Sequence, residues 1–272
     1  MERKQKQPID IVILSHERSA IITDMLTKIK ERTHYPHRII VCDNDSSEAA
    51  KNNLKRLVEK GFIDKLILNN FNKWPEGFNP GLTIVNGDLY CLSDPDIIVP
   101  DLGENCWLSR LVDYMNKYPF MGKIGLHISM DNYPPKHAYS REYYIRKFES
   151  KFVGNTNNEI FEAPVDTTMA ICRRDLFETY NEAYPEIPLV DHQARYRRNY
   201  KVGRTAHPLS CVHKGFDEYK DLSDENIRYI ANKNKTIESK HYRRLIRTLR
   251  FKKWKQGLKN FCAKAFNHAE GR

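Results

Sequence analysis

The sequence predicts an α/β fold with a mostly parallel sheet flanked by helices. Short apolar runs typical of buried strands alternate with stretches whose apolar residues recur at helical spacing, in units of roughly thirty residues. Polar clusters follow several of the apolar runs, as expected where the strands of such a sheet end. A chain of 272 residues can bury the core of one large α/β domain or of two small ones.

The first strand is expected over residues 8–15, where five apolar residues are bounded by polar ones. A helix is expected next, because apolar residues then recur at helical spacing: Ile21, Ile22, Met25, Leu26 and Ile29. A second buried strand is expected over residues 38–42. Ser46 or Ser47 can cap the helix that follows, over residues 48–60.

A third strand is expected over residues 65–68, followed by an Asn-rich loop at 69–79 and a short helix at 82–86. The apolar run after this helix predicts a buried strand that leads into Asp94. The strand must stop there, because Pro95 cannot donate a hydrogen bond to a sheet ladder.

The second half of the chain alternates less regularly. Its expected elements are helices at 107–117, 173–184 and 192–199, and strands at 122–129, 163–172, 202–206 and 209–215. A long polar and aromatic stretch at 130–158 could form a mobile loop over a site.

Composition argues against secreted and membrane-spanning proteins. No stretch approaches the roughly eighteen apolar residues of a transmembrane helix, and residues 1–7 lack the apolar core of a signal peptide. We therefore expect a protein kept in the cytoplasm. Six cysteines without a C-x-x-C pair are expected to be reduced core residues: Cys42, Cys91, Cys106, Cys172, Cys211 and Cys262.

The net charge of +10 is concentrated at the C-terminus. Residues 240–272 hold eleven Lys or Arg and one acidic residue, which leaves 34 basic and 34 acidic residues in the first 239. A neutral globular part argues against a basic nucleic-acid-binding fold. The excess charge instead indicates a separate electrostatic module.

This charged segment is predicted to be a basic amphipathic helix. Its apolar residues recur at helical spacing with one phase slip: Tyr242, Leu245, Ile246, Leu249, Trp254, Leu258 and Phe261. A basic amphipathic helix with a Trp is typical of an interfacial anchor, which predicts attachment to the anionic inner face of the cell membrane. A helix packed on the rest of the protein is the alternative. A nucleic-acid-binding arm is not expected, because the aromatic residues are not interleaved for base stacking.

Two carboxylates, Asp94 and Asp96, flank Pro95 at the end of an expected strand. Acidic groups this close repel each other unless a cation lies between them, and Mg²⁺ and Mn²⁺ prefer carboxylate oxygens. An acidic turn that caps a strand is the alternative. Polar clusters at His16 and Asp43 follow two other strands, and a parallel sheet places all three clusters at one edge. This placement favours a metal site.

Five short motifs occur in order between residues 9 and 215. They are the turn Ser15-His16-Glu17-Arg18, the turn Asp43-Asn44-Asp45-Ser46, the loop Gly77-Phe78-Asn79-Pro80-Gly81, the pair Asp94 and Asp96, and the pair His213 and Gly215. Their order and spacing resemble the family 2 glycosyltransferases of GT-A fold, in which such segments end the first two strands, precede the metal strand, supply its Asp-x-Asp motif and close a late strand. The resemblance implies a GT-A domain over residues 8–239.

The resemblance also implies a nucleotide-sugar donor, UDP- or GDP-linked, with Mn²⁺ or Mg²⁺ as cofactor. Asp96 and His213 are the expected metal ligands, and Asp94 is expected to face the metal or the ribose. A strand-end histidine without a metal is the alternative for His213. The residues expected to contact the donor are Ser15, His16, Arg18, Asp43, Asn79 and Asp94.

Two of these residues could recognise the base of the donor. His16 could stack on the ring, and Asp43 could accept a hydrogen bond from a base N–H. Asp43 could equally bond the amides of its own turn, at residues 44–46. Arg18 could meet the phosphates or be a solvated surface charge.

An inverting transfer needs a carboxylate that takes the proton of the acceptor hydroxyl. The family places this base in a Glu-Asp pair at the start of a helix, before a Gly-Tyr-Arg-Val-like segment. Residues 199–202 resemble that segment, which implies Asp191 as the base, although Val190 stands where the Glu is expected. The alternative is that Asp191 is the N-cap of the helix after it. Asp166 is the second candidate for the base.

We therefore expect a metal-dependent, inverting hexosyltransferase that acts on a lipid-linked or surface glycan at the membrane. Residues 8–100 would form its nucleotide-binding half and residues 101–239 its acceptor-binding half. A catalytically inactive nucleotide- or glycan-binding protein is the main alternative, favoured by Val190. A sugar nucleotidyltransferase has less support, because residues 14–20 contain no glycine that could cradle a triphosphate.

Overall fold

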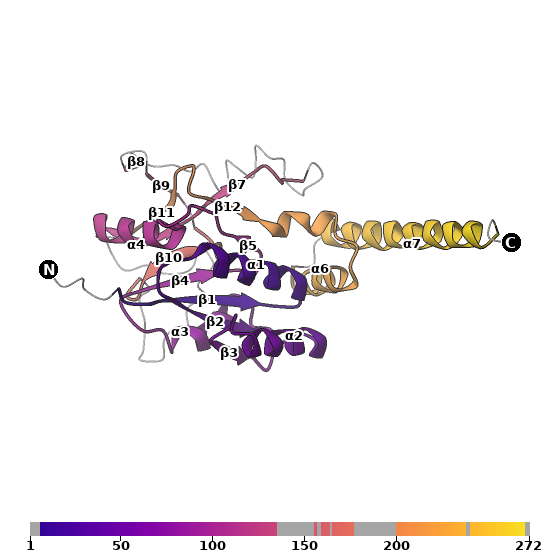
Figure 1. Ribbon diagram of the computed structural model, residues 1–272, viewed down its shortest axis with the longest axis horizontal. Coiled ribbons are helices and arrows are strands. Elements are labelled where there is room, and N and C mark those ends of the chain that lie inside the picture. The colour runs from indigo at the N-terminus through magenta and orange to yellow at the C-terminus, as the bar shows by residue number, and fades with distance from the viewer. Residues whose placement is uncertain are drawn as a thin grey trace.

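The computed structural model describes residues 6–134, 155–156, 159–163, 165–176, 200–237 and 240–269 (Figure 1). Its strands are β1 (Ile9–Ser15), β2 (His37–Asp43), β3 (Lys65–Leu68), β4 (Leu89–Ser93), β5 (Ile97–Ile98), β6 (Met121–Gly125), β7 (His127–Ser129), β8 (Asn155–Thr156), β9 (Ile160–Glu162), β10 (Ala170–Arg173), β11 (Lys201–Thr205) and β12 (Ser210–His213). Its helices are α1 (Ser19–Arg32), α2 (Glu48–Glu59), α3 (Asn79–Leu82), α4 (Trp107–Lys117), α6 (Asp224–Ile237) and α7 (Lys240–Ala269), with 3₁₀ helices η1 (Trp74–Phe78) and η3 (Lys214–Tyr219).

The main sheet has nine strands in the order β3-β2-β1-β4-β10-β6-β11-β9-β8. The strands β3, β2, β1 and β4 are parallel to one another, whereas β10 runs antiparallel to both of its neighbours. Ser15 pairs with Asp43, and Ile13 pairs with Ser93. The carboxyl ends of β1, β2 and β4 therefore meet at one edge, as the sequence predicts.

A second sheet of three strands, in the order β5-β12-β7, lies beside this edge. In it His213 pairs with Ile97 in antiparallel register. Because Ile97 directly follows Asp96, this pairing brings two of the expected metal ligands together from positions far apart in the chain.

Two apolar clusters bury the two faces of the main sheet. Alternate residues of β1 serve different clusters, since Ile11 and Ile13 belong to the first and Val12 to the second. The helices α1, α2 and α4 cover the first face, and α4 contributes the fully buried Trp107. Phe78 of η1 and Leu82 of α3 belong to the second cluster. The α/β prediction, with a mostly parallel sheet flanked by helices, is confirmed.

The short helix after η1 lies earlier than predicted. It spans Asn79–Leu82 rather than residues 82–86. Pro80 lies in its first turn, where the missing N–H of proline costs nothing. Gly81 explains why the helix can pack so closely, because a Cβ there would lie 2.7 Å from Cys42 Sγ and from a methyl group of Val12.

Two predicted strands differ from the observed ones. The strand expected over residues 122–129 is divided into β6 and β7, which belong to different sheets, and between them the N–H of Leu126 donates to the carbonyl of Met169. The strand expected over residues 163–172 begins only at Ala170. The carbonyls of Val165 and Asp166 accept hydrogen bonds from Lys123 Nζ instead of joining a ladder.

Several predictions lie outside the described residues, in whole or in part. These are the loop over the site at 130–158, the helices at 173–184 and 192–199, and the base Asp191. The five cysteines that the structure describes are buried, reduced thiols, as predicted: Cys42, Cys91, Cys106, Cys172 and Cys211.

The helices α6 and α7 form a pair that we call the α6–α7 unit, and α6 was not predicted. The pair has an apolar cluster of its own that includes Ile230, Leu245 and Leu249. α7 begins at Lys240, where the charged segment was expected to begin, and its second half projects beyond the rest of the described molecule (Figure 1). In the described part of the chain, no helix is long and apolar enough to cross a membrane.

Candidate active site

The loop between β1 and α1 has an unusual backbone. Glu17 and Arg18 follow one another with φ values of 53° and 58°, in the left-handed region that side chains other than glycine rarely adopt. The Glu17 carboxylate accepts hydrogen bonds of 2.9 Å from the N–H and the hydroxyl of Ser47. The N–H of Glu17 donates to Ser46 Oγ over 2.7 Å. These bonds to the β2–α2 loop hold the turn in place, and the turn directs Arg18 inward.

Arg18 forms an ion pair with Asp96 inside the protein. Its Nη1 lies 3.1 Å from Asp96 Oδ2, and the two residues are only 2 % and 5 % exposed. Burial alone would raise the pKa of Asp96, but His213 and Arg18 beside it lower that pKa below its ordinary value. Asp96 therefore stays ionised, which a metal ligand requires.

The Arg18 guanidinium is only partly satisfied by this ion pair. Among the described residues, its Nε and Nη2 have no hydrogen-bond partner, although both atoms are buried. The ring of Tyr229, from α6, lies against the guanidinium at 4.5 Å. Buried N–H groups without an acceptor cost free energy, so their presence points to a ligand that brings oxygen acceptors.

His213 and Asp96 face each other across a short gap. His213 Nε2 lies 3.9 Å from Asp96 Oδ1, which has no hydrogen-bond partner in the described part of the chain. The His213 ring stacks on Phe216, with ring centroids 4.7 Å apart. Gly215 lies against both groups, because a Cβ there would come within 2.6 Å of Asp96 Oδ2. This contact explains the glycine of the motif.

These residues fit a divalent ion. A buried carboxylate oxygen without a partner and an imidazole nitrogen beside it form a donor set that suits Mn²⁺. Over the residues that the structure describes, however, no three His, Cys, Asp or Glu side chains come together as a complete metal site. The expected third ligand, Asp94, is engaged elsewhere.

Asp94 is bonded to Thr167. The Asp94 N–H donates to the Thr167 carbonyl over 2.7 Å, and the Thr167 hydroxyl donates to Asp94 Oδ2 over 2.5 Å. Burial and the charge of Asp96 raise the pKa of Asp94 well above its ordinary value. The two aspartates of the motif therefore differ, since Asp96 is kept charged and Asp94 is shifted toward its neutral form.

The loop before β10 carries Asp166, the second candidate for the base. Asp166 Oδ1 accepts hydrogen bonds from the N–H and hydroxyl of Thr168 and forms an ion pair with Arg204 at 3.2 Å. The partial burial of Asp166, whose side chain is 43 % exposed, would raise its pKa, but Arg204 and Thr168 lower that pKa to about 2. Lys123 and Arg204, both fully buried, hold this loop beside Asp94.

The residues expected to recognise the base lie in tight turns. Asp43 is fully buried, and Ser46 donates a hydrogen bond to each of its oxygens. This geometry matches the alternative role in its own turn. His16 Nδ1 lies 3.0 Å from the carbonyl of Asn44, which ties the ring to the same turn.

Ser15 and Asn79, the other expected donor residues, lie at the end of β1 and at the start of α3. The Ser15 carbonyl accepts a hydrogen bond from the N–H of Asn44 over 2.7 Å. Asn79 is the first residue of α3. Ser47 stands at the N-cap of α2 as expected, but its hydroxyl bonds to Glu17 rather than to the helix.

Sequence reasoning missed three contributors to this site. Tyr229 comes from α6, a helix that was not predicted although Ile227 and Ile230 recur in it at helical spacing. Thr167 and Arg204 carry no motif, and only the fold brings them to Asp94 and Asp166. A polar run after Asp166 was the only signal for this loop.

Comparison with known proteins bears on the site. The sequence model of glycosyl transferase family 2 matches residues 10–180. No curated protein matches the chain.

Among solved structures, the chain is similar to the mannosyltransferase PcManGT from Pyrobaculum calidifontis in complex with GDP-Man and Mn²⁺, with 16 % identity, a TM-score of 0.53, and coverage of 88 % of this chain and 68 % of that one. It is also similar to S. aureus TarS 1–349 in complex with UDP-GlcNAc, with 11 % identity, a TM-score of 0.51 and coverage of 81 % and 60 %. A third similar structure is GalNAc-T7 with UDP, GalNAc and Mn²⁺, with 13 % identity, a TM-score of 0.51 and coverage of 78 % and 44 %. At these identities the likeness concerns the fold.

Proposed function

Because the chain belongs to glycosyl transferase family 2, we propose that it transfers a sugar from a UDP- or GDP-linked donor to a glycan or lipid-linked acceptor, with Mn²⁺ or Mg²⁺ as cofactor. The observation that carries this proposal is the group formed by the buried Arg18 and Asp96 with the partly exposed His213. It combines a charged carboxylate, an imidazole and unpartnered guanidinium N–H groups at the carboxyl edge of a parallel sheet. PcManGT contains GDP-Man and TarS 1–349 contains UDP-GlcNAc in these solved structures, which supports the donor class.

Each group has a separate task in this proposal. Asp96 and His213 would hold the divalent ion, which, when bound, supplies positive charge to the leaving nucleotide. The Nε and Nη2 groups of Arg18 would donate to phosphate oxygens, and such charge-assisted hydrogen bonds are strong. Asp94, with its raised pKa and its bond to Thr167, would bind a hydroxyl of the donor rather than carry charge.

The proton of the acceptor hydroxyl must also be removed for an inverting transfer. Asp191, which lies outside the described residues, is proposed for this role. Asp166 lies beside the site, but its pKa of about 2 makes it a weak proton acceptor. Asp166 is better suited to orienting a substrate hydroxyl.

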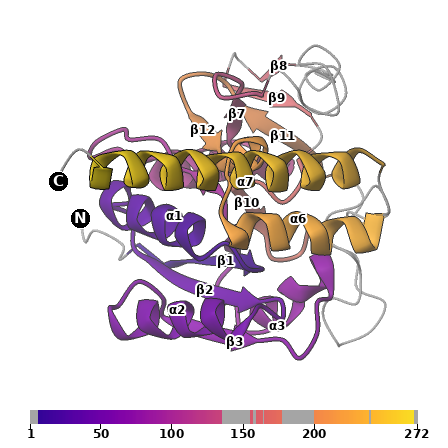
Figure 2. The same ribbon diagram turned by 90° about the vertical axis from the view of Figure 1, so that its right-hand side faces the viewer.

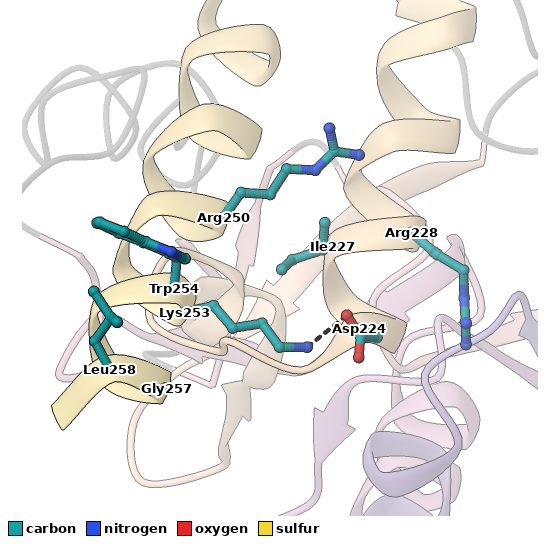
Figure 3. Close-up of a pocket in the computed structure, with 8 residues that line it drawn as sticks. All are labelled: Asp224, Ile227, Arg228, Arg250, Lys253, Trp254, Gly257 and Leu258. Atoms are coloured by element: carbon teal, nitrogen blue, oxygen red, sulfur yellow. Dashed lines mark ion pairs between the residues drawn. The ribbon is translucent and has the colours of Figure 1, made fainter. Parts of the chain in front are cut away.

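We propose that the end of α7 attaches the protein to an anionic membrane. Phe251, Trp254 and Leu258 are 54 %, 59 % and 44 % exposed and lie on one side of the helix. Trp254 and Leu258 line a groove of about 670 Å³ between α6 and α7, which Arg250 and Lys253 also line (Figure 3). Exposed aromatic residues among cations are typical of a membrane-interface helix.

The experiment that tests the donor site is isothermal titration with UDP, GDP, CDP and TDP, each with MnCl₂ and again with EDTA. We expect one diphosphate to bind tightly and its binding to be lost with EDTA and in Asp96→Asn. Asparagine keeps a hydrogen bond to Arg18 but removes the charged metal ligand. Asp101→Asn is the matched control, because Asp101 is exposed on the same segment.

The other outcomes are equally clear. The proposed function is wrong if none of the diphosphates binds. It is also wrong if the affinity is the same with and without EDTA and in Asp96→Asn. If a diphosphate binds but no sugar is transferred from the corresponding nucleotide sugar to any offered acceptor, the alternative of an inactive binding protein is favoured.

A further inference from the structure

One face of α6 lies against the loop between β1 and α1. The side chains on this face are Glu225, Tyr229 and Asn232, whose spacing of four and three residues places them on one side of a helix. Glu225 Oε1 accepts a hydrogen bond of 2.7 Å from the N–H of Ser19, the first residue of α1. Figure 2 shows α6 beside α1 and below α7. α6 lies outside the family match at residues 10–180.

The ring of Tyr229 lies against the guanidinium of Arg18. The guanidinium carbon lies 4.5 Å from the centre of the Tyr229 ring, a distance typical of a cation–π contact. Among the described residues, one hydrogen bond, from Nη1 to Asp96, holds the Arg18 guanidinium, and its Nε and Nη2 have no partner. One bond does not fix the plane of a guanidinium, so the ring packed against it limits where Nε and Nη2 can point.

Asn232 holds His16 in a similar way. The Nδ1 of His16 faces the carbonyl of Asn44, so this nitrogen carries the proton and donates. The Nε2 is then an acceptor, and Asn232 Nδ2 lies 3.4 Å from it in a position to donate. The ring is therefore fixed from both ends, between the β2–α2 loop and α6.

We propose that α6 forms a wall of the donor site, in which Tyr229 and Asn232 are positioning residues that act through Arg18 and His16. Tyr229 orients the guanidinium toward the diphosphate of the donor, and Asn232 fixes the imidazole against the nucleobase. This inference rests on the proposed function and extends it to a helix outside the family match. The two residues have separate roles, because Tyr229 affects the binding of the phosphates and Asn232 affects the binding of the base.

The test compares the affinities of nucleosides and nucleoside diphosphates, with MnCl₂ present, in the full-length protein. The probes are uridine, UDP, guanosine and GDP, and the variants are Tyr229→Leu, Tyr229→Phe and Asn232→Ala. Lys235→Ala is the matched control, because Lys235 is an exposed residue of the same helix. Thermal unfolding of each variant shows whether it is folded at the temperature of titration.

We expect Tyr229→Leu to lower the affinities for UDP and GDP by a common factor of about 5 to 30, because a desolvated cation–π contact contributes roughly 1–2 kcal/mol. The affinities for uridine and guanosine should stay unchanged. Tyr229→Phe keeps the ring and should bind within about twofold of the wild type. Asn232→Ala should change the ratio of UDP to GDP affinity by at least about threefold while keeping the gain that the diphosphate gives over the nucleoside.

A loss of affinity that is equal for nucleosides and diphosphates in Tyr229→Leu would show that Tyr229 only supports the fold, and would overturn the inference. So would an unchanged UDP-to-GDP ratio in Asn232→Ala. If the wild type binds a diphosphate and these variants match it, only the role of α6 is wrong. If the wild type binds no diphosphate, the proposed function falls and this inference with it.

Discussion

The region from β1 to β4 and the α6–α7 unit are held in different ways. In the first, parallel ladders join the strands, and two apolar clusters bury both faces of the sheet. The α6–α7 unit packs around its own cluster and contacts the β1–α1 loop through Glu225, Tyr229 and Asn232. The candidate site lies where the two regions meet. Its groups therefore depend on two cores, and a substitution in either core should leave the other packed.

The exposed end of α7 should give the largest effect, since it lies beyond both cores. Truncation after Arg250 removes Phe251, Trp254, Leu258 and six Lys or Arg residues. At about 1 kcal/mol for each basic residue near an anionic surface, the six removed charges are worth about 6 kcal/mol, so we expect binding to vesicles of phosphatidylcholine with phosphatidylglycerol to fall more than ten-thousandfold. Vesicle cosedimentation measures this loss, and vesicles of phosphatidylcholine alone are the control.

The same truncation should leave the melting temperature nearly unchanged, because Leu245 and Leu249 stay in place. A truncation after residue 239 is a poorer test of the anchor, because it also removes these buried residues. Vesicle binding that persists after truncation at Arg250 would contradict the anchor proposal.

The second effect concerns the site at the boundary between the regions. Asp96→Ala leaves the Arg18 guanidinium, only 2 % exposed, without its ion-pair partner. Breaking a buried ion pair from one side costs about 3–5 kcal/mol, so we expect a loss of this size in the free energy of unfolding. Urea unfolding in the absence of metal measures it.

The double variant Arg18→Met with Asp96→Ala sharpens this prediction. It removes the unpaired charge, so most of the lost free energy of unfolding should return. If the double variant is as unstable as Asp96→Ala, the cost comes from packing rather than from an unpaired charge.

The third effect compares the two halves of α7. Leu249 is fully buried against α6, whereas Leu258 is 44 % exposed. We expect Leu249→Ala to lower the free energy of unfolding by about 2–3 kcal/mol and Leu258→Ala to change it by less than about 0.5 kcal/mol. Chemical denaturation of both variants checks this difference, and equal losses would show that α7 is packed along its whole length.

The sequence predicted the two regions unequally. The strands β1 to β4 and the helix α4 were predicted almost to the residue, because each is a short apolar run or a helical pattern bounded by polar or turn residues. The phase slip in the charged segment also has a structural meaning. Leu245 and Leu249, before the slip, pack on α6, whereas Trp254 and Leu258, after it, are exposed.

What sequence alone could not predict depends on contacts between distant residues. Arg18 and Asp96 are 78 positions apart, and they form an ion pair only because the fold brings both to the same edge of the sheet. The late start of β10 accompanies the bonds of Lys123, a buried lysine whose carbonyl partners are 42 and 43 residues away. The division of β6 from β7 accompanies the bond from the Leu126 N–H to the Met169 carbonyl. The metal motif was visible, but the separate environments of Asp94 and Asp96 depend on Thr167 and Arg18.

The smallest effect concerns acid stability of the loop before β10. The pKa of Asp166 in the folded protein is about 2, below its ordinary value of 3.8, so its ion pair with Arg204 stabilises the protein above pH 4 and is lost as the pH falls toward 2. The Asp166 side chain is 43 % exposed, so its contribution is at most about 1 kcal/mol. We expect Asp166→Asn to unfold more easily than the wild type by about this amount at pH 6, and the difference to shrink as the pH falls from 5 to 3. Urea unfolding across this range measures the difference. A difference that stays constant with pH would assign the role of Asp166 to its hydrogen bonds with Thr168, which do not depend on the ion pair with Arg204.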